Sequence, residues 1–156
     1  MNREIRKVER ADLPALKIVL DSSELFPSAM LDDMINDYLI NEQSTDIWFT
    51  ATDQGTPISI GYCAPERMTD GTYNLYAIAV SKDQQGKGIG KQMMTYIENE
   101  LRDSGHRILI VETSGLPAFE LTREFYVKCH YIQQAVIPEF YEAGDDKVVF
   151  WKKLQE

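Results

Sequence analysis

Three glycines at alternate positions constrain the fold of this chain more than any other feature of its sequence. Gly86, Gly88 and Gly90 follow an apolar, β-favouring run that ends at Val80. A helical pattern begins directly after them, and its apolar positions share one face: Ile89, Met93, Met94, Ile97 and Leu101. A strand, a glycine turn and a helix in this order direct free backbone N–H groups and the positive end of a helix to one place, where a phosphate group fits.

Two nucleotide-binding designs fit these glycines less well. A P-loop has four residues between its glycines and then Lys followed by Ser or Thr, whereas Gly86 and Gly90 are separated by three, and Gln92 follows Lys91. A dinucleotide-binding turn needs a third small residue where Lys91 stands. Glu112, at the end of the next predicted strand, does imitate the ribose-binding acid of that turn. The dinucleotide design therefore stays open as a minor alternative.

The segment Gln85–Gly90 matches the pattern Gln/Arg-x-x-Gly-x-Gly/Ala without a mismatch. Placed after a strand and before an amphipathic helix, it resembles the acyl-CoA loop of the GNAT superfamily of N-acetyltransferases. The segment from Arg123 to Tyr131 is similar to that family's Phe-Tyr-x-x-x-Gly-Phe/Tyr sequence, with Tyr126 in register. One departure is His130, which stands at a helix-ending position of positive φ where the family usually has Gly.

The spacing of apolar residues predicts the order β-α-α-β-β-β-α-β-α-β-β. We expect strands over residues 4–8, 47–52, 58–63, 73–80, 107–112, 131–137 and 146–154, and a loop between the last two. We expect helices over residues 12–22 and 28–39, from the glycines to residue 103, and over residues 117–129, with Asp12 and Ser28 as N-caps. This order predicts an α/β fold with a mixed sheet and helices on both faces. It is also the GNAT order, which implies a mostly antiparallel central sheet with one parallel, splayed strand pair.

Length and charge narrow the class of protein. The 156 residues suit one domain spanning residues 1–156. The net charge of −9 argues against a nucleic-acid partner. Between Ile18 and Glu66 there are nine acids and no Lys or Arg, which is either a solvated face or the flank of a site that attracts a cationic amine.

The remaining composition predicts a cytoplasmic protein without a membrane span. No apolar run approaches the length of about 18 residues that a span requires, and the N-terminal residues lack an apolar signal core. Cys63 and Cys129 read as two free thiols. With only two His and no metal-binding spacing, we expect no metal site.

The GNAT resemblance implies acetyl-CoA as co-substrate and a set of residues that bind it. Backbone groups of Ile78, Ala79 and Val80 would pair with the pantetheine arm as if it were an added strand. The diphosphate would lie on the loop residues, which are Gln85, Gly86, Lys87, Gly88, Ile89, Gly90 and Lys91. Tyr126 would be the general acid that protonates the departing thiolate, the alternative being a core tyrosine with its hydroxyl bonded to backbone.

The general base and the acceptor are less constrained. The strand over residues 73–80 carries no acid, so Glu112 could act as base directly or through water; a structural role for Glu112, or no dedicated base, is equally open. Phe26, Tyr38 and Tyr62 are candidate contacts to the acceptor, a primary amine of a small molecule or peptide that attacks directly in a ternary complex. The alternative is a non-catalytic CoA- or nucleotide-binding regulatory domain. Exposed strand edges could pair two copies into a homodimer.

Overall fold

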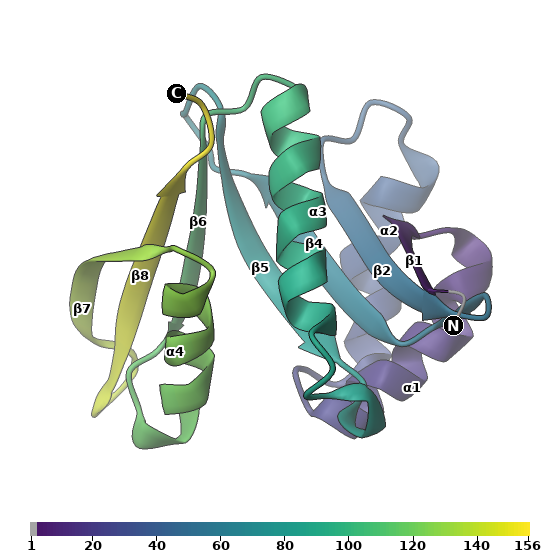
Figure 1. Cartoon of the computed structure of the whole chain (residues 1–156), viewed down its shortest axis with the longest axis horizontal. Coiled ribbons are helices and arrows are strands. Elements are labelled where there is room, and N and C mark those ends of the chain that lie inside the picture. The colour runs from purple at the N-terminus through teal and green to yellow at the C-terminus, as the bar shows by residue number, and fades with distance from the viewer. Residues whose placement is uncertain (1–2) are drawn as a thin grey trace.

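The computed structural model describes residues 3–156, which form one mixed sheet with helices on both faces (Figure 1). Within these residues the sheet has eight strands in the order β1-β2-β4-β5-β6-β8-β7, with the short β3 paired to β2. The strands are β1 (Arg3–Lys7), β2 (Ile47–Asp53), β3 (Thr56–Pro57), β4 (Ser59–Pro65), β5 (Thr72–Val80), β6 (Ile108–Ser114), β7 (Ile132–Glu142) and β8 (Asp145–Lys153). β5 and β6 are parallel, and the other described pairs are antiparallel, which confirms the predicted mixed sheet.

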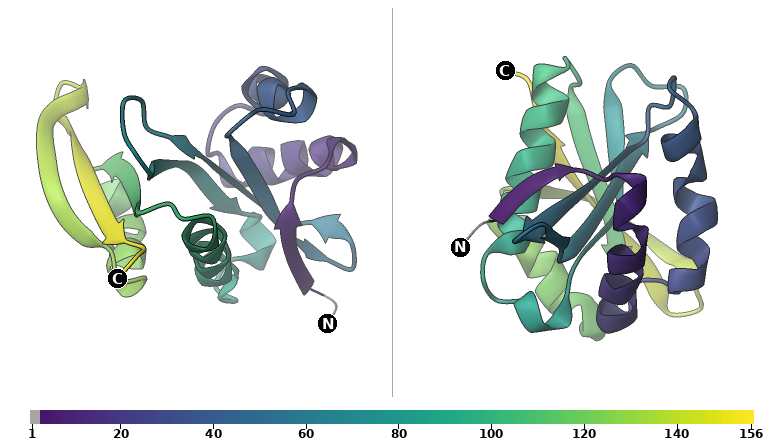
Figure 2. Two further views of the ribbon diagram at one scale, coloured as in Figure 1. Left: turned by 90° about the horizontal axis from the view of Figure 1, so that it is seen from above. Right: turned by 90° about the vertical axis from the view of Figure 1, so that its right-hand side faces the viewer.

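Within residues 3–156, four α-helices cover the sheet. α1 (Leu13–Ser23) and α2 (Leu31–Ile40) lie on one face, and α3 (Ile89–Asp103) and α4 (Glu120–Lys128) lie on the other (Figure 2). Short 3-10 turns precede them: η1 (Arg10–Asp12), η2 (Ser28–Met30), η3 (Lys82–Gln84) and η4 (Pro117–Phe119). Of the helices in residues 3–156, none combines the length and the apolar character needed to cross a lipid bilayer.

Each face of the sheet has its own apolar core. The predicted apolar face of α3, from Ile89 to Leu101, is almost fully buried together with Phe49, Leu109 and Phe150. On the other face, α1 and α2 bury Leu16, Leu20, Leu31 and Ile35 against Trp48 and Ile60. Burying one such side chain contributes about 1.5–3 kcal/mol. These two layers hold the end of β5 and the start of α3 in fixed positions.

The loop expected between the last two strands is wrong. β7 continues through Pro138 to Glu142, and only Ala143 and Gly144 separate it from β8. Pro138 is tolerated because β7 lies at the edge of the sheet, where a missing N–H leaves no neighbour unpaired. The pairing shifts between Ile137 and Glu142, so an irregular segment, with Glu139 at φ 53°, replaces regular pairing there.

Of the two expected N-caps, Ser28 is wrong in position, and Asp12 occupies the N-cap position of α1 without making the capping bond. The Asp12 side chain makes no capping bond to α1; it accepts hydrogen bonds from Arg6 at 2.7 and 2.9 Å and from the Glu9 N–H at 2.8 Å. Ser28 begins the turn η2, and α2 starts three residues later at Leu31. Ser28 lies too early in the chain to cap α2, because a 3-10 turn precedes that helix, whereas Asp12 stands at the N-cap position of α1 with its carboxylate bonded to Arg6 and to the Glu9 N–H instead.

Candidate active site

The parallel strands β5 and β6 separate after four paired residues, the last pair being Leu75 with Val111. Leu75 pairs with Cys63 of β4, and Ala77 pairs with Tyr62, so Tyr76 is an extra residue without a partner in β4. Such a bulge bends a strand and increases its twist. The end of β5 therefore diverges from β6, and the two ribbons splay apart in Figure 1, as predicted.

The bulged strand leaves backbone groups of β5 directed into this opening. The Ser81 N–H donates to the Ile58 carbonyl at 2.8 Å, which fixes the alternation of pairing between β4 and β5. The N–H and C=O of Ile78 and Val80 therefore point away from β4, and the Gln85 side-chain amide donates to the Val80 carbonyl at 3.0 Å. Ala79 pairs its own backbone groups with β4, and the residue also lines the opening.

The glycine loop lies at the end of this opening. Gly86 and Gly88 have φ of 79° and 80°, a region that favours glycine, and a Cβ on either would meet open space. Within the described chain, none of the N–H groups of residues 85–91 donates to a protein acceptor. Lys87 bonds the Gln84 side chain at 3.2 Å. The loop thus offers free donors and a helix N-terminus, which is the arrangement that binds a diphosphate.

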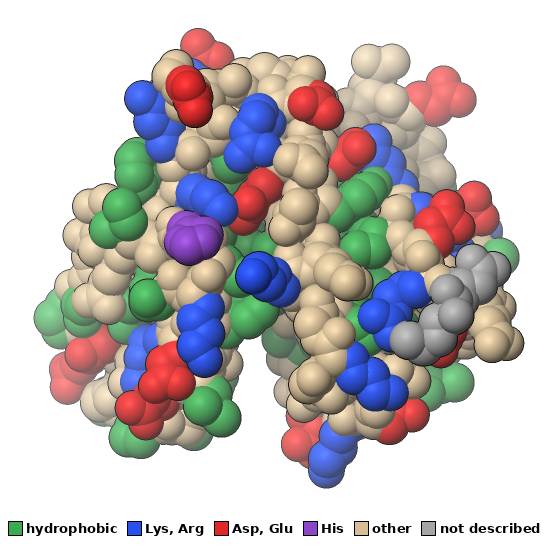
Figure 3. All heavy atoms as spheres, viewed as in Figure 1, with side chains coloured by type: hydrophobic (Ala, Val, Ile, Leu, Met, Phe, Trp, Pro, Cys, Tyr) green, Lys and Arg blue, Asp and Glu red, His purple; other side chains and the backbone are tan. Residues whose placement is uncertain are grey.

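A cavity of about 640 Å³ joins the loop to the splayed strands. It is lined by parts of α1, β5, the glycine loop and α4: Ser23, Glu24, Leu25, Ile78, Ala79, Val80, Gln85, Gly86, Gly90, Phe119, Leu121, Thr122, Phe125 and Tyr126. A hollow of about 410 Å³ continues from it along Gly88, Ile89 and Lys91. Figure 3 shows the surface notched on this side, between the part built on α4 and β8 and the part built on α3. The structure therefore gathers all of the predicted cofactor residues except Lys87 around two adjoining hollows.

Tyr126 lies at the inner end of the larger cavity. Its side chain is buried against Phe125, Tyr131 and Phe150, with ring centroids between 5.4 and 6.1 Å away. Among residues 3–156, no group hydrogen-bonds its hydroxyl. Burial raises the pKa of Tyr126, so the phenol keeps its proton at neutral pH. A phenol that lines a cavity and has no internal partner can donate to a bound group.

Glu112 lies on β6, across the opening from the bulge. Its carboxylate pairs with Lys147 of β8 at 2.8 Å, and it does not line either of the two hollows. Burial and the nearby Glu66 carboxylate, followed by Tyr62 and Glu112, raise the pKa of Tyr76 to about 12. Glu112 is therefore close to the bulge but is not part of the cavity lining that includes Tyr126.

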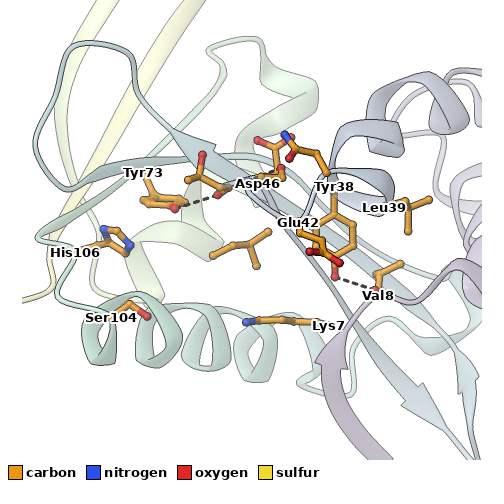
Figure 4. Close-up of a pocket in the computed structure, with 13 residues that line it drawn as sticks. Lys7, Val8, Tyr38, Leu39, Glu42, Asp46, Tyr73, Ser104 and His106 are labelled. Atoms are coloured by element: carbon orange, nitrogen blue, oxygen red, sulfur yellow. Dashed lines mark hydrogen bonds between the residues drawn. The ribbon is translucent and has the colours of Figure 1, made fainter.

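The three predicted acceptor contacts lie apart from one another. Phe26 lines a depression of about 370 Å³ after α1, and Tyr62 stacks on Trp48 at 4.1 Å. Tyr38 donates to the Val8 carbonyl at 2.8 Å and lines a separate hollow of about 590 Å³ at the far end of α3, shown in Figure 4. Only Phe26 lies beside the cavity that holds Tyr126, because Glu24 and Leu25 line both spaces.

Several lining residues had no signal in the sequence. Phe119, Leu121 and Phe125 belong to the helix expected over residues 117–129, where apolar residues predict burial. In the structure, Phe119 and Leu121 are exposed beside the cavity. Glu24 is one of nine acids in the acidic segment and carries no motif. Its left-handed backbone, at φ 57°, and its place at the cavity appear only when α1 is packed beside β5.

Comparison with known proteins decides the family. A model of the "Acetyltransferase (GNAT) family" matches residues 4–131, which is most of the chain. The chain belongs to the GNAT family of acetyltransferases. The match spans the splayed strands, the glycine loop and Tyr126, so the resemblance of these segments to GNAT enzymes is confirmed.

Individual GNAT relatives agree with this assignment. A solved structure from Desulfovibrio desulfuricans, described as an acetyltransferase of the GNAT family, is 27% identical with a TM-score of 0.92 and covers 98% of this chain and 99% of its own. An uncharacterised N-acetyltransferase of Methanocaldococcus jannaschii is 29% identical over 89 residues, and the match spans 55% of this chain but only 54% of that protein. A Salmonella typhimurium protein with the same fold was solved with its cofactor acetyl-CoA; it has a TM-score of 0.79 at 17% identity and covers 99% of this chain and 95% of its own.

Proposed function

We propose that this GNAT protein transfers the acetyl group of acetyl-CoA to a primary amine of a small molecule or peptide, by direct attack in a ternary complex. The observation that carries the proposal is the row of free backbone N–H groups over residues 85–91, beside the open edge of β5. These donors suit the diphosphate of acetyl-CoA, and the backbone groups of Ile78 and the N–H of Val80 suit the amides of its pantetheine arm.

The reaction forms a C–N bond and breaks a C–S bond. The acceptor nitrogen attacks the thioester carbonyl carbon, sulfur leaves as a thiolate, and the nitrogen loses a proton. The free N–H groups at the end of β5 are placed to polarise the carbonyl, and removal of such a donor typically costs about 10²-fold or more in rate. The Tyr126 hydroxyl supplies the proton that the thiolate takes up.

Glu112 is the proposed general base, and it acts through water. Its carboxylate lies next to the bulge at Tyr76 but does not line the cavity, so one or more water molecules must connect it to the acceptor amine. Lys147 holds the Glu112 side chain in place across β6 and β8.

A thiol-release assay tests the proposal. The protein is mixed with acetyl-CoA and a panel of amines, and free CoA is measured. We expect CoA release that depends on the amine. Binding of acetyl-CoA without release for any amine would indicate a silent CoA-binding domain, and a melting temperature raised by NAD or ATP but not by CoA would indicate a nucleotide-binding module.

A further inference from the structure

The end of α1 forms the acceptor side of the large cavity. α1 stops at Ser23, and the Glu24 N–H donates to the Leu20 carbonyl at 2.9 Å while Glu24 adopts a left-handed backbone. This turn places Glu24 and Leu25 on the cavity wall that faces α4. The β5 edge and the glycine loop are the parts suited to acetyl-CoA, so the wall formed by α1 is left for the acceptor.

Glu24 is the one side chain with a formal charge in the described lining of that cavity. Over residues 3–156 its carboxylate has no hydrogen bond or ion pair. Every other lining group is apolar, an uncharged polar side chain or glycine backbone. An unpaired carboxylate beside a largely apolar cavity attracts a cation that enters it.

The neighbouring depression has the same character. Its lining is Leu20, Asp21, Glu24, Leu25, Phe26 and Pro27, which contributes a second carboxylate, an aromatic ring and no basic side chain. The chain between Ile18 and Glu66 has no Lys or Arg, and no basic side chain is among the described residues that line the cavity and this depression. A cation held here would contact the Glu24 carboxylate and lie near the Phe26 ring.

We propose that Glu24 binds a second, positively charged group of the acceptor, which makes the substrate a small amine with a cationic group a few carbons from the reacting nitrogen. This inference rests on the proposed acetyl transfer. The reacting nitrogen must be uncharged when it attacks, so a permanent carboxylate at the cavity wall is useful for another cation. Glu112 does not fill this role because it pairs with Lys147 and lies outside the cavity lining.

The test compares two acceptors that differ only in the far group: 1,4-diaminobutane and 4-amino-1-butanol. We expect the wild-type kcat/KM to favour the diamine by about three- to fivefold beyond the statistical factor of two, since an ion pair with an exposed carboxylate has a modest effect. Glu24→Gln should remove that preference, leave the amino alcohol within about twofold of wild type, and leave acetyl-CoA affinity and melting temperature unchanged. Asp33→Asn, which removes an equal charge from the first turn of α2 outside both hollows, should keep the preference.

The outcomes distinguish failure of the proposed role of Glu24 from failure of the proposed acetyl transfer. Equal loss for both acceptors in Glu24→Gln, or a wild type without preference for the diamine, overturns the role of Glu24 while acetyl transfer stands. A protein that releases CoA with other amines but with neither of these two overturns the proposed substrate class. Absence of release with every amine, despite acetyl-CoA binding, overturns the acetyl transfer itself and the role of Glu24 with it.

Discussion

Among single residues, Tyr126 has the most specific chemical environment. Its ring is fixed by three aromatic neighbours, while its hydroxyl faces a cavity rather than a protein acceptor. Burial first, and the Cys129 thiol second, raise its pKa, so the phenol keeps its proton and can donate a hydrogen bond to a group bound in the cavity. The alternative of a core tyrosine bonded to backbone is not supported, since no such bond is present within residues 3–156.

Replacing Tyr126 by Phe tests the proposed general acid. We expect kcat to fall by about 10²-fold, because general acid catalysis contributes at least that much, with little change in acetyl-CoA affinity. Single-turnover CoA release and acetyl-CoA titration measure the two quantities. Unaltered turnover would remove Tyr126 from the mechanism. Tyr131→Phe makes the same change on a ring that contacts Tyr126, so it is the control for packing. It also loses the hydrogen bond from Tyr131 to Glu98 at 2.8 Å.

Replacing Glu112 by Gln tests the proposed base. The variant keeps the side-chain volume but cannot accept a proton, so the acidic limb of the pH profile of kcat/KM should disappear and the plateau rate should fall by about 10²-fold. Lys147→Met is the control, because it removes the ion pair at 2.8 Å but keeps the carboxylate, and its acidic limb should remain. An acidic limb that persists in Glu112→Gln would exclude Glu112 as the base.

Asp12 provides a test of stability against pH. Hydrogen bonds from Arg6, the largest cause, together with the Glu9 N–H, lower the pKa of Asp12. A carboxyl group with a lower pKa in the folded state stabilises the fold at pH values above its unfolded-state pKa. This stabilisation is lost as pH falls through the folded-state pKa. Asp12→Asn should therefore cost about 2 kcal/mol at neutral pH and almost nothing near pH 2, measured by urea unfolding.

The control for Asp12 is Asp32→Asn, which removes an exposed pair with Lys17 at 2.9 Å. Exposed pairs contribute little, so this change should alter stability far less than Asp12→Asn at every pH. An Asp12 effect that does not shrink in acid would show that the side chain acts through shape rather than charge.

At the scale of elements, the turn after α4 contains His130, where the GNAT family usually has Gly. His130 has φ of 69°, as the resemblance to a Gly position predicted, and its N–H donates to the Val127 carbonyl at 2.9 Å. The same turn returns the chain so that the Tyr131 N–H bonds the Tyr126 carbonyl at 3.0 Å. Having His130 in place of Gly therefore adds conformational strain to the turn but leaves its geometry unchanged.

His130→Gly should raise the free energy of unfolding by about 1 kcal/mol, because glycine has no Cβ to strain the left-handed conformation. Chemical denaturation measures the change. His130→Ala keeps the Cβ and removes the imidazole, so it should match the wild type. A glycine variant no more stable than the alanine variant would contradict this explanation.

The elements that sequence periodicity located best are those with a repeating apolar face. The apolar residues of α3 from Ile89 to Leu101 recur at helical spacing, and β6 contains a short apolar run. Each pattern therefore predicts one type of element, and both segments are buried as predicted. The sequence predicts that β7 ends at Ile137, because Pro138 argues against a strand, and the strand continues only because it lies at the edge of the sheet. Edge position depends on which strands pair, and a single sequence does not state that.

For the whole molecule, the mixed sheet and its parallel pair followed from the order of elements, and the glycine loop and Tyr126 were selected by their motifs. The cavity wall formed by the end of α1 could not be predicted in the same way. Glu24, Ile78 and Tyr126 are about fifty residues apart in sequence and meet only through the sheet and its two helical layers. Phe26 lines the depression beside this cavity, whereas Tyr38 and Tyr62, which share its aromatic character, lie elsewhere.

The central claim is that the free amides of residues 85–91 receive the diphosphate of acetyl-CoA. A crystal structure of the protein with acetyl-CoA tests it most directly. We predict diphosphate oxygens within hydrogen-bond distance of these amides, the pantetheine arm against Ile78 and Val80, and the sulfur beside the Tyr126 hydroxyl. Acetyl-CoA bound elsewhere, or a loop whose amides turn away from the diphosphate, would contradict the account.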